Sequence, residues 1–577
     1  MKHYLCTAVL LLAAPALAND KQDFADCDGR NHPGKQDDGM RGESSISAYD
    51  SFRFGSGLSP ALLGAVRGMV ADNGRVAACT RALASPRLLP TQALRKAHLL
   101  RARGAAHLQG GNVDLATLDL DAAEAALADR TADPFYQRSM GASLKLLRAI
   151  ALAQQGKWDD ARALATTARE ARPYSLRLQN VAAEILAAAP DQSGAPSPWN
   201  GVLRLDPAVG HRALQDAAKQ ANHADVLRLA PAVDTAIAFP DPAPLNPGFQ
   251  PALPLDAIKA MFSGFAIAHA RAATGDLAGA KRFRDALAAQ LTDRKARLDA
   301  RDAAAVPPAG AGPTPAALAA ADPAAPPPPA RPRDPILTLG EQRLRLLDLR
   351  IAQVEGRVAD ARAMALGSAL PVDGSTIEML TRLNAVLPAK DRLPVPDLAA
   401  LTEKARQNDQ LQLRQLAQQA LIAPETPRTV IDYSKSRPNI LGALVGGAVT
   451  MGFGLLGGID RTDGFRSTPQ ADGTIKVEFV GNTPSEPLVQ EMTLLRAAEM
   501  AQAAGRWGFA IARRADYTRY LVTSRGGFES SRVPTGHKTE LFIRYVNDGE
   551  DPLRGFGAVS LIDALGPLYY EDKPGKR

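Results

Sequence analysis

The sequence predicts a mainly α-helical protein, built from antiparallel helix-pair repeats and followed by a small C-terminal α+β domain. Three observations lead to this fold class. Aromatic residues make up only 5% of the 577 residues, and small helix formers favour helix-on-helix packing. A short motif of glycine, four residues and alanine recurs along the chain. The apolar period changes from helical to alternating after residue 465.

The first eighteen residues have the features of a secretory signal peptide. Lys2 and His3 precede an apolar run at residues 5–12, and Ala16-Leu17-Ala18 is an A-x-A cleavage pattern. The run is too short to cross a membrane. We therefore expect cleavage near Ala18 and a periplasmic or secreted mature protein, with a buried first helix as the alternative.

Loss of the signal peptide removes Cys6 and leaves Cys27 and Cys79. In an oxidising compartment such a pair can form a disulfide. The bridge would tie the irregular leader at residues 19–58 to the first helices. The alternative is two free thiols, one of them buried on a helix as a small apolar side chain.

Composition and periodicity divide the rest of the chain into consecutive parts. We expect helical repeats over residues 59–303, an Ala/Pro-rich linker over 304–335 and a further helical repeat region over 336–428. A Gly-rich apolar connector follows at 429–464, and the α+β domain covers 465–577. A tract so rich in proline favours an extended spacer, and we prefer that interpretation to a recognition motif.

The glycine–alanine motif occurs four times, and each copy follows one apolar-periodic helix and opens another. Its glycine suits the left-handed turn that ends a helix, and its alanine lets the second helix approach the first closely. The motif therefore predicts antiparallel helix pairs. The copies are Gly111 with Ala116, Gly156 with Ala161, Gly275 with Ala280, and Gly356 with Ala361.

In these copies the chain resembles the tetratricopeptide repeat (TPR) family. That family places a small residue twelve positions before the alanine of the second helix, another seven positions after it, and a proline at the end of the repeat. The resemblance implies a concave face that binds an extended peptide or a partner domain. A run of separate helix hairpins is the alternative. The matching positions are Gly104, Ala116 and Ala123 in the first copy, and Ala149, Trp158, Ala161, Ala168 and Pro173 in the second.

By the same resemblance, His98 and Arg101 lie on the groove side of the first helix in the first copy. An arginine in that position can meet the carboxylate of a bound peptide. The alternative is an ordinary solvated arginine. Both residues are our candidate binding residues for a protein or peptide partner.

The glycine-rich apolar segment at residues 439–459 has two interpretations. It is long enough to span a bilayer, and its glycines would let helices pack closely. Glycine is a poor helix former, however, and the segment has few large apolar residues. We favour a connector packed against the C-terminal domain, with a membrane-associated envelope component as the alternative.

The C-terminal domain combines strand and helix patterns. Residues 475–479 alternate apolar and charged side chains, which is typical of a half-buried strand. Thr483, Pro484 and Glu486 predict a capping box at the start of a helix, and Gly505 suits its C-terminal cap.

Residues 477–484 and 494–499 resemble a family of small envelope lipoproteins of Gram-negative bacteria. The resemblance implies no particular activity, and this chain lacks the lipid-attachment cysteine of that family. Six arginines make the strands basic, either as solvent-facing positions or as contacts to an anionic envelope polymer or lipid head group. They are Arg513, Arg514, Arg519, Arg525, Arg532 and Arg544.

The sequence contains no motif that we can assign to catalysis, a metal or a cofactor. The histidines lack metal-ligand spacing, and no P-loop or dinucleotide glycine motif opens a helix. The net charge of +7 is spread among alternating acidic and basic residues, which argues against nucleic-acid binding. The sequence thus predicts an exported, non-catalytic scaffold or protein-binding protein, with an enzyme in the C-terminal domain as a second alternative.

Overall fold

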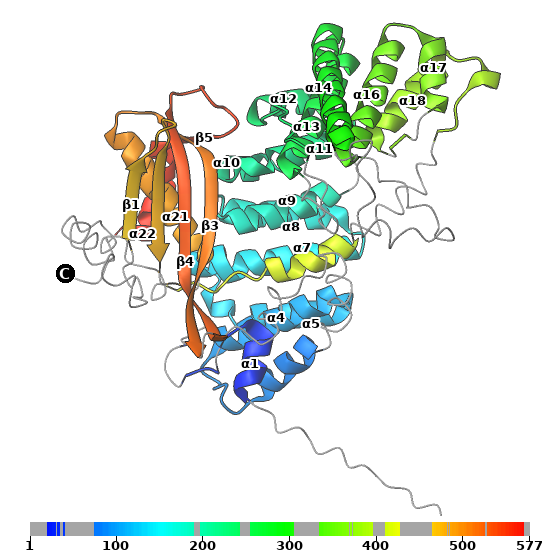
Figure 1. Cartoon of the computed structure of the whole chain (residues 1–577). Coiled ribbons are helices and arrows are strands. Elements are labelled where there is room, and N and C mark those ends of the chain that lie inside the picture. Colours follow the sequence, from blue (N-terminus) through cyan, green and yellow to red (C-terminus); the bar gives the residue numbers. More distant parts are fainter. Residues whose placement is uncertain are drawn as a thin grey trace, which may run out of the picture. The chain divides into compact units, whose positions relative to one another are not determined.

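A computed structural model gives the structure of the chain (Figure 1). It describes residues 20–30, 32–34, 38–40, 74–189, 197–242, 254–304, 334–367, 370–371, 373–395, 410–426, 464–481, 483, 485–525 and 528–570, without the side chains of 520–535. The predicted signal peptide, most of the Ala/Pro-rich tract and the segment 439–459 lie outside these residues. Contacts divide the chain into two compact units: residues 1–190, 204–206 and 406–577 form the first, and 191–203 and 207–405 form the second.

The first unit begins with helices that lie one after another in sequence. Helix pairs of adjacent elements dominate it, as the repeats predict. Its helices are α1 (Asp20–Asp28), a helix over 74–84, α4 (Ala93–Gln109), α5 (Val113–Ala125), η1 (Ala128–Arg130), α6 (Pro134–Tyr136), the π-helix η2 (Gln137–Gly141), α7 (Ala142–Gln154), α8 (Trp158–Ala171) and α9 (Leu176–Ala188).

The second unit contains helices and no strand among its described residues. Its helices are most of α10 (Asn200–Leu205), then η3 (Pro207–Val209), α11 (Gly210–Lys219), α12 (His223–Leu229), η4 (Ala230–Ala232), α13 (Leu255–Ala273), α14 (Leu277–Ala304), α16 (Pro335–Val354), α17 (Val358–Leu366), α18 (Gly374–Val386) and η5 (Ala389–Asp391). Helices α14 and α16, on either side of the Ala/Pro-rich tract, pack against each other through Leu291 and Ile336.

The repeated turns confirm the role predicted for the glycine–alanine motif. Gly111, Gly156, Gly275 and Gly356 all have left-handed backbones, with φ of +77°, +77°, +96° and +75°. In each turn the residue after the glycine donates its N–H to a carbonyl five positions earlier, as Lys157 does to Leu152 at 2.9 Å. The motif alanines Ala116, Ala161, Ala280 and Ala361 are completely buried, so each second helix approaches its partner closely.

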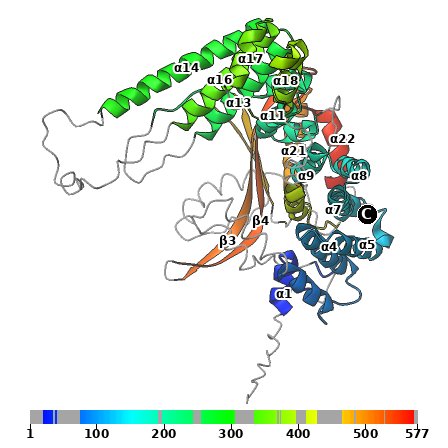
Figure 2. The ribbon, with the colours of Figure 1, turned by 90° about the vertical axis from the view of Figure 1, so that its right-hand side faces the viewer.

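Residues 464–570 form the C-terminal α+β domain within the first unit. The antiparallel sheet has the order β1-β2-β4-β3-β5, and β3 and β4 make a long two-stranded ribbon (Figures 1 and 2). Helix α21 packs on the sheet, and α22 packs on α21. The elements are β1 (Gly464–Pro469), β2 (Ile475–Gly481), α21 (Glu486–Ala503), β3 (Gly508–Arg525), β4 (Phe528–Val546), β5 (Gly555–Gly557) and α22 (Ala558–Tyr569).

The start of α21 corrects the predicted capping box. The helix begins at Glu486, so Ser485 and not Thr483 is the N-cap residue, and no side chain caps it. The Thr483 hydroxyl instead accepts the N–H of Ser485 at 3.2 Å, and the Ser485 hydroxyl donates to Glu425 at 2.5 Å. The Ser485 hydroxyl thus bonds to the distant carboxylate of Glu425 instead of capping the start of α21. Gly505, with φ of +66°, ends the helix as predicted.

The disulfide predicted between Cys27 and Cys79 is present. Both residues are buried with Phe24 and Leu99 in a small core between α1, the helix over 74–84 and α4. The bridge spans 52 residues of sequence and fixes α1 to the repeats. The prediction of an irregular leader over residues 19–58 was therefore wrong for residues 20–28, which form a helix held by this core.

The two units do not follow the expected order of domains along the chain. Residues 410–426 return to the first helices, and Leu413, Leu416 and Ile422 share one core with α4, α5 and α7. Likewise, Tyr174 and Leu176 pack against the core of the C-terminal sheet. Sequence periodicity identifies a segment's secondary structure but not the element on which it packs, so this pairing was not predictable.

Candidate functional site

The candidate site is the face of the repeats made by the first helix of each pair, α4 and α7, together with α9. We call it the repeat face, and we call residues 410–426 the covering segment. The segment consists of a helix over 410–419 and an extended stretch over 421–426. In Figure 1 the helix is yellow and lies along α7, and in Figure 2 it lies on the opposite side of α7 from α8.

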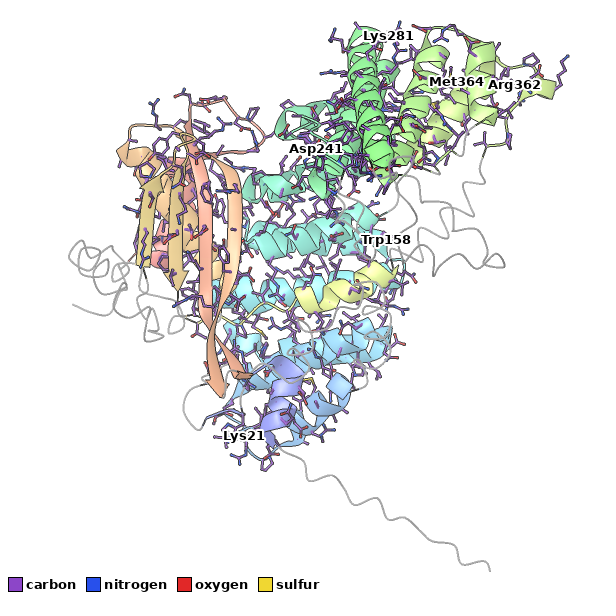
Figure 3. All side chains as sticks on the ribbon, viewed as in Figure 1. Lys21, Trp158, Asp241, Lys281, Arg362 and Met364 are labelled. Carbon is purple, nitrogen blue, oxygen red and sulfur yellow. A yellow bond between two sulfur atoms is a disulfide. The ribbon has the colours of Figure 1, made fainter. Side chains whose placement is uncertain are left out.

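Helix geometry explains why one face collects the contacts. The left-handed glycine turns reverse the chain, and the buried alanines hold the second helices α5 and α8 against the first ones. Neighbouring pairs then expose the first helices on one side. Trp158, which begins α8, is half-buried and belongs to the same core (Figure 3).

Side chains of the repeat face bind the main chain of the covering segment. Three donors from three helices approach consecutive parts of its backbone. Such bonds hold a main chain without reading its side chains. Three of the four carbonyls belong to the end of the helix over 410–419 and the turn after it, where a helix leaves its carbonyls without internal partners, and the fourth belongs to the stretch over 421–426. They run from Arg177 to the carbonyls of Gln418 and Gln419 at 3.1 and 2.7 Å, from Ser143 to the carbonyl of Ala420, and from Arg101 to the carbonyl of Ile422 at 2.6 Å.

The extended stretch ends in a buried ionic cluster at Glu425. Arg172 donates to Glu425 at 2.9 Å and to Glu491 of α21 at 2.8 Å. Arg138 forms an ion pair with Glu425 at 3.4 Å and another with Glu491. The hydroxyl of Tyr569 donates to Glu491 at 2.5 Å. We call these five side chains the junction cluster, because they come from the repeats, the covering segment and the C-terminal domain.

The charges of the junction cluster balance, with two guanidinium groups facing two carboxylates. Burial alone would raise the pKa of Glu425, but the positive charges of Arg172 and Arg138 outweigh it and hold that pKa below its usual value. Burial lowers the pKa of Arg172 and raises that of Tyr569. Glu425 is therefore ionised at neutral pH and acts as the carboxylate that two arginines bind, without a face open to a substrate.

The structure corrects the open position predicted for His98 and Arg101. Both lie on the repeat face, as the TPR resemblance implied, but they are 5% and 0% exposed. The Nη2 atom of Arg101 contacts the ring of His98 at 2.7 Å and donates to the Ile422 carbonyl, so the covering segment occupies the place expected for a partner. The resemblance placed the two residues on this face but could not reveal what covers it.

A second ionic cluster surrounds these two residues and has an excess of positive charge. Asp28 bonds to Arg95 at 2.9 Å and lies 3.5 Å from His98. Burial, reinforced by Arg101, lowers the pKa of His98 well below its usual value, so the imidazole is neutral. Burial also lowers the pKa of Arg101 to about 9 and that of Arg30 to about 10, which leaves both charged at neutral pH. We call these five side chains the Asp28 cluster.

The remaining repeat positions serve packing. Gly104 faces Ala116 and Leu120 so closely that a methyl group there would lie 3.3 Å from the Ala116 carbonyl. The other predicted small residues are buried in the core between helices, and Pro173 follows the end of α8. They are Ala123, Ala149 and Ala168.

The C-terminal arginines do not form one uniform basic surface. Arg514 is buried and donates to Asp516 at 2.6 Å, whereas Arg513 stacks over Phe542 with its guanidinium carbon 3.8 Å from the ring centroid. Arg544 pairs with Asp551 at 2.5 Å. The side chains of Arg525 and Arg532 lie outside the described residues.

The second unit has a polar cluster of its own, in which Arg350 and His269 are buried and His223 and Glu378 are partly buried. Arg350 of α16 donates to Glu378 of α18 at 2.5 Å and lies 3.2 Å from His223 of α12. The ring of His269 on α13 is 5.8 Å from that of His223. Burial lowers the pKa of His269 to about 3. Burial opposes ionisation of Glu378, but His223 and Arg350 outweigh it and lower its pKa to about 2. Contacts among these four side chains thus link the helices α12, α13, α16 and α18.

A surface pocket of about 280 Å³ lies between α16 and α17 in the second unit. Arg345, Asp348 and Met364 line it, and Figure 3 labels Met364. The Asp348 carboxylate is 3.5 Å from Arg284, and burial raises its pKa. The described lining brings together one carboxylate and one guanidinium without a nucleophile or a metal-ligand set.

Sequence reasoning missed the junction cluster and one turn. Ala221 has a left-handed backbone, with φ of 57°, between α11 and α12. Asn222 donates its N–H to the carbonyl of Ala217 at 3.0 Å, which repeats the geometry of the glycine turns. A search for glycine passes over this pair, although its spacing from Val226, which is buried, matches the motif.

Among the described residues, no group of three His, Cys, Asp or Glu side chains has the geometry to hold a metal ion, and no helix is both long and apolar enough to cross a membrane. The chain matches no protein-family model and no curated protein sequence.

Proposed function

We propose that this protein is an exported, TPR-like scaffold of the cell envelope that binds a protein partner through an extended peptide and performs no catalysis itself. The observation that carries the proposal is the mode in which the repeat face holds the covering segment. Arg101, Ser143 and Arg177 donate to peptide carbonyls in succession. A face that presents donors to a peptide main chain is suited to peptide recognition.

The position of the functional groups supports binding over catalysis. The carboxylates of the junction cluster are ionised or engaged by arginine and tyrosine side chains, and all of them are buried. A general acid or base must lie within hydrogen-bonding distance of the substrate proton that it transfers. The cluster is better suited to holding three parts of the first unit together.

Crosslinking in the native envelope tests the binding half of the proposal. A photoreactive residue at Gln419, which is exposed beside the repeat face, should capture a specific protein. The matched control is the same residue at Lys96, which is exposed on α4. Capture of the same species at both positions, or of none at either, would contradict a partner at the repeat face.

A reporter fusion tests export. Residues 1–25 should direct a periplasmic reporter across the membrane, whereas the same fusion with Val9→Arg and Leu10→Arg should leave it in the cytoplasm, since charge in the apolar run blocks a signal peptide. A wild-type fusion that stays in the cytoplasm would contradict the envelope location.

A further inference from the structure

The covering segment already occupies the repeat face, and the contacts between the two define which peptide could replace the segment. We infer that residues 410–426 are an intramolecular ligand, and that the partner of this face is a peptide that displaces them by presenting an apolar side chain and a carboxylate in the places of Ile422 and Glu425. The inference rests on the proposed function and adds the class of partner and its regulation.

The contacts of the covering segment are those of a ligand with its receptor. The donors come from α4, α7 and α9, and each binds a main-chain carbonyl of the covering segment. In return, Glu425 donates its N–H to the Ser139 hydroxyl at 3.1 Å. Bonds of this kind tolerate another peptide sequence, because every peptide offers the same carbonyl and amide groups.

Only a few side chains of the stretch contribute specificity. Ile422 is 1% exposed and belongs to the repeat core. Glu425 inserts its carboxylate between Arg138 and Arg172. Leu421 and Ala423 are only partly buried. Pro424 is buried as well. The recognised pattern is therefore an apolar residue followed, three positions later, by an acidic one, with a buried proline directly before the acidic residue.

Charge explains why the replacement must be acidic. Without Glu425, the two guanidinium groups of the junction cluster would face Glu491 alone. A buried, unbalanced positive charge is costly, so the face cannot stay empty at this end. A neutral peptide would leave the imbalance, whereas a carboxylate would restore the balance.

The repeat helices have contacts of their own that survive displacement. Helices α4 and α5, α7 and α8, and α8 and α9 pack pairwise, and α5 and α9 each contact α7. The helix over 410–419 keeps an exposed side, with Leu411 56% exposed. The covering segment thus lies on a framework that is already assembled.

Binding of a synthetic peptide to the full-length protein tests the inference. The probe is a fluorescein-labelled peptide of residues 410–428, compared with the same peptide carrying Glu425→Gln. Ile422→Ala in the full chain weakens the internal ligand, and Leu411→Ala is the matched control in the same segment. Because an internal competitor lowers apparent affinity by the open fraction, Ile422→Ala should bind the probe at least tenfold more tightly than wild type. Leu411→Ala should match wild type, and the Glu425→Gln peptide should bind at least tenfold more weakly.

A folded Ile422→Ala protein that binds the probe no better than wild type would overturn the inference. If that variant does not fold, hydrogen exchange of the wild-type chain decides. Excess probe should accelerate exchange in residues 410–426 and leave α4 and α7 protected; equal protection of all three with and without probe overturns the inference. These results do not depend on export or on a captured partner, so failure of the crosslinking experiment would count against the proposed function alone.

Discussion

The two units of the chain use the same helix pair but are stabilised in different ways. In the first unit, the glycine-turned pairs gather distant segments: α1 through a disulfide, residues 410–426 through main-chain bonds, and α21 through the junction cluster. In its described residues, the second unit joins its helices through apolar cores and through a polar cluster centred on Arg350 and Glu378. The comparison indicates that helix repeats bury only the surfaces between neighbouring pairs, so that other segments of the chain can cover the faces that remain.

The largest expected difference between the units comes from the junction cluster. Glu491→Gln leaves Arg138 and Arg172 with one buried carboxylate, and breaking a buried ion pair in this way costs about 3–5 kcal/mol. We expect hydrogen exchange in increasing urea to report that loss in α7 and α21 and little change in α13 and α16.

The matched change in the second unit is Glu378→Gln. This carboxylate is partly solvated, so the free energy lost should be smaller and confined to the helices that the cluster joins, α12, α13, α16 and α18. Equal losses in both units from Glu491→Gln would show that the units do not unfold separately and would remove the basis of the comparison.

The disulfide provides the next test. A bridge that closes a loop of 52 residues stabilises by about 4 kcal/mol on loop entropy, and roughly 2–4 kcal/mol is typical. Cys27→Ala with Cys79→Ala should therefore lower the urea midpoint of the first unit. The second unit contains no cysteine, so a reducing agent added to the wild-type protein should reproduce the effect in the first unit and leave the second unchanged.

Acid should weaken the second unit through His269, which faces Arg350, His223, Glu378 and Arg343. Its pKa is about 3 when folded and about 6.5 when unfolded. Below pH 6.5 the unfolded chain binds a proton that the folded unit does not. Stability is therefore complete above that pH and falls by about 1.4 kcal/mol per pH unit toward pH 3.

His269→Gln should flatten this dependence, measured by urea unfolding of α13 and α16 between pH 6.5 and 5. Glu378, whose pKa of about 2 lies below its unfolded value, loses its contribution only as the pH falls from about 4.5 toward 2, and so does not interfere in that range. In the first unit, His98 is also held neutral, and its pH dependence should persist in the His269→Gln protein. An unchanged slope in α13 and α16 would show that His269 is not the group that titrates.

The smallest effects should come from the turns that both units share. A methyl group at Gly156 meets no atom within 4 Å, so Gly156→Ala probes only the left-handed backbone and should cost about 1 kcal/mol. Ala221→Gly in the second unit relieves the same conformation and should stabilise by about 0.5–1 kcal/mol. Thermal unfolding should show opposite signs, and destabilisation by both would contradict the equivalence of the two turns.

The sequence by itself determined the parts of this protein that depend on neighbouring residues. The left-handed glycines, the buried alanines five positions later, the glycine cap of α21 and the alternating strand at 475–479 follow from local backbone and packing rules. The cysteine count predicted either a disulfide between Cys27 and Cys79 or two free thiols, and the structure has the disulfide.

Only the tertiary structure decided where the faces of these elements lie and what covers them. Glu425 is 253 residues from Arg172, and Glu491 is 319 residues from it, so no periodicity or motif connects them. Ser485 bonds to Glu425 of the same cluster and does not cap α21. His98 and Arg101 lie on the predicted face, but the covering segment buries them. Local rules act over one helical turn, whereas burial and charge balance act on whatever the fold brings together. Most of the secondary structure was therefore predictable, with α1 and the start of α21 as exceptions, and the site was not.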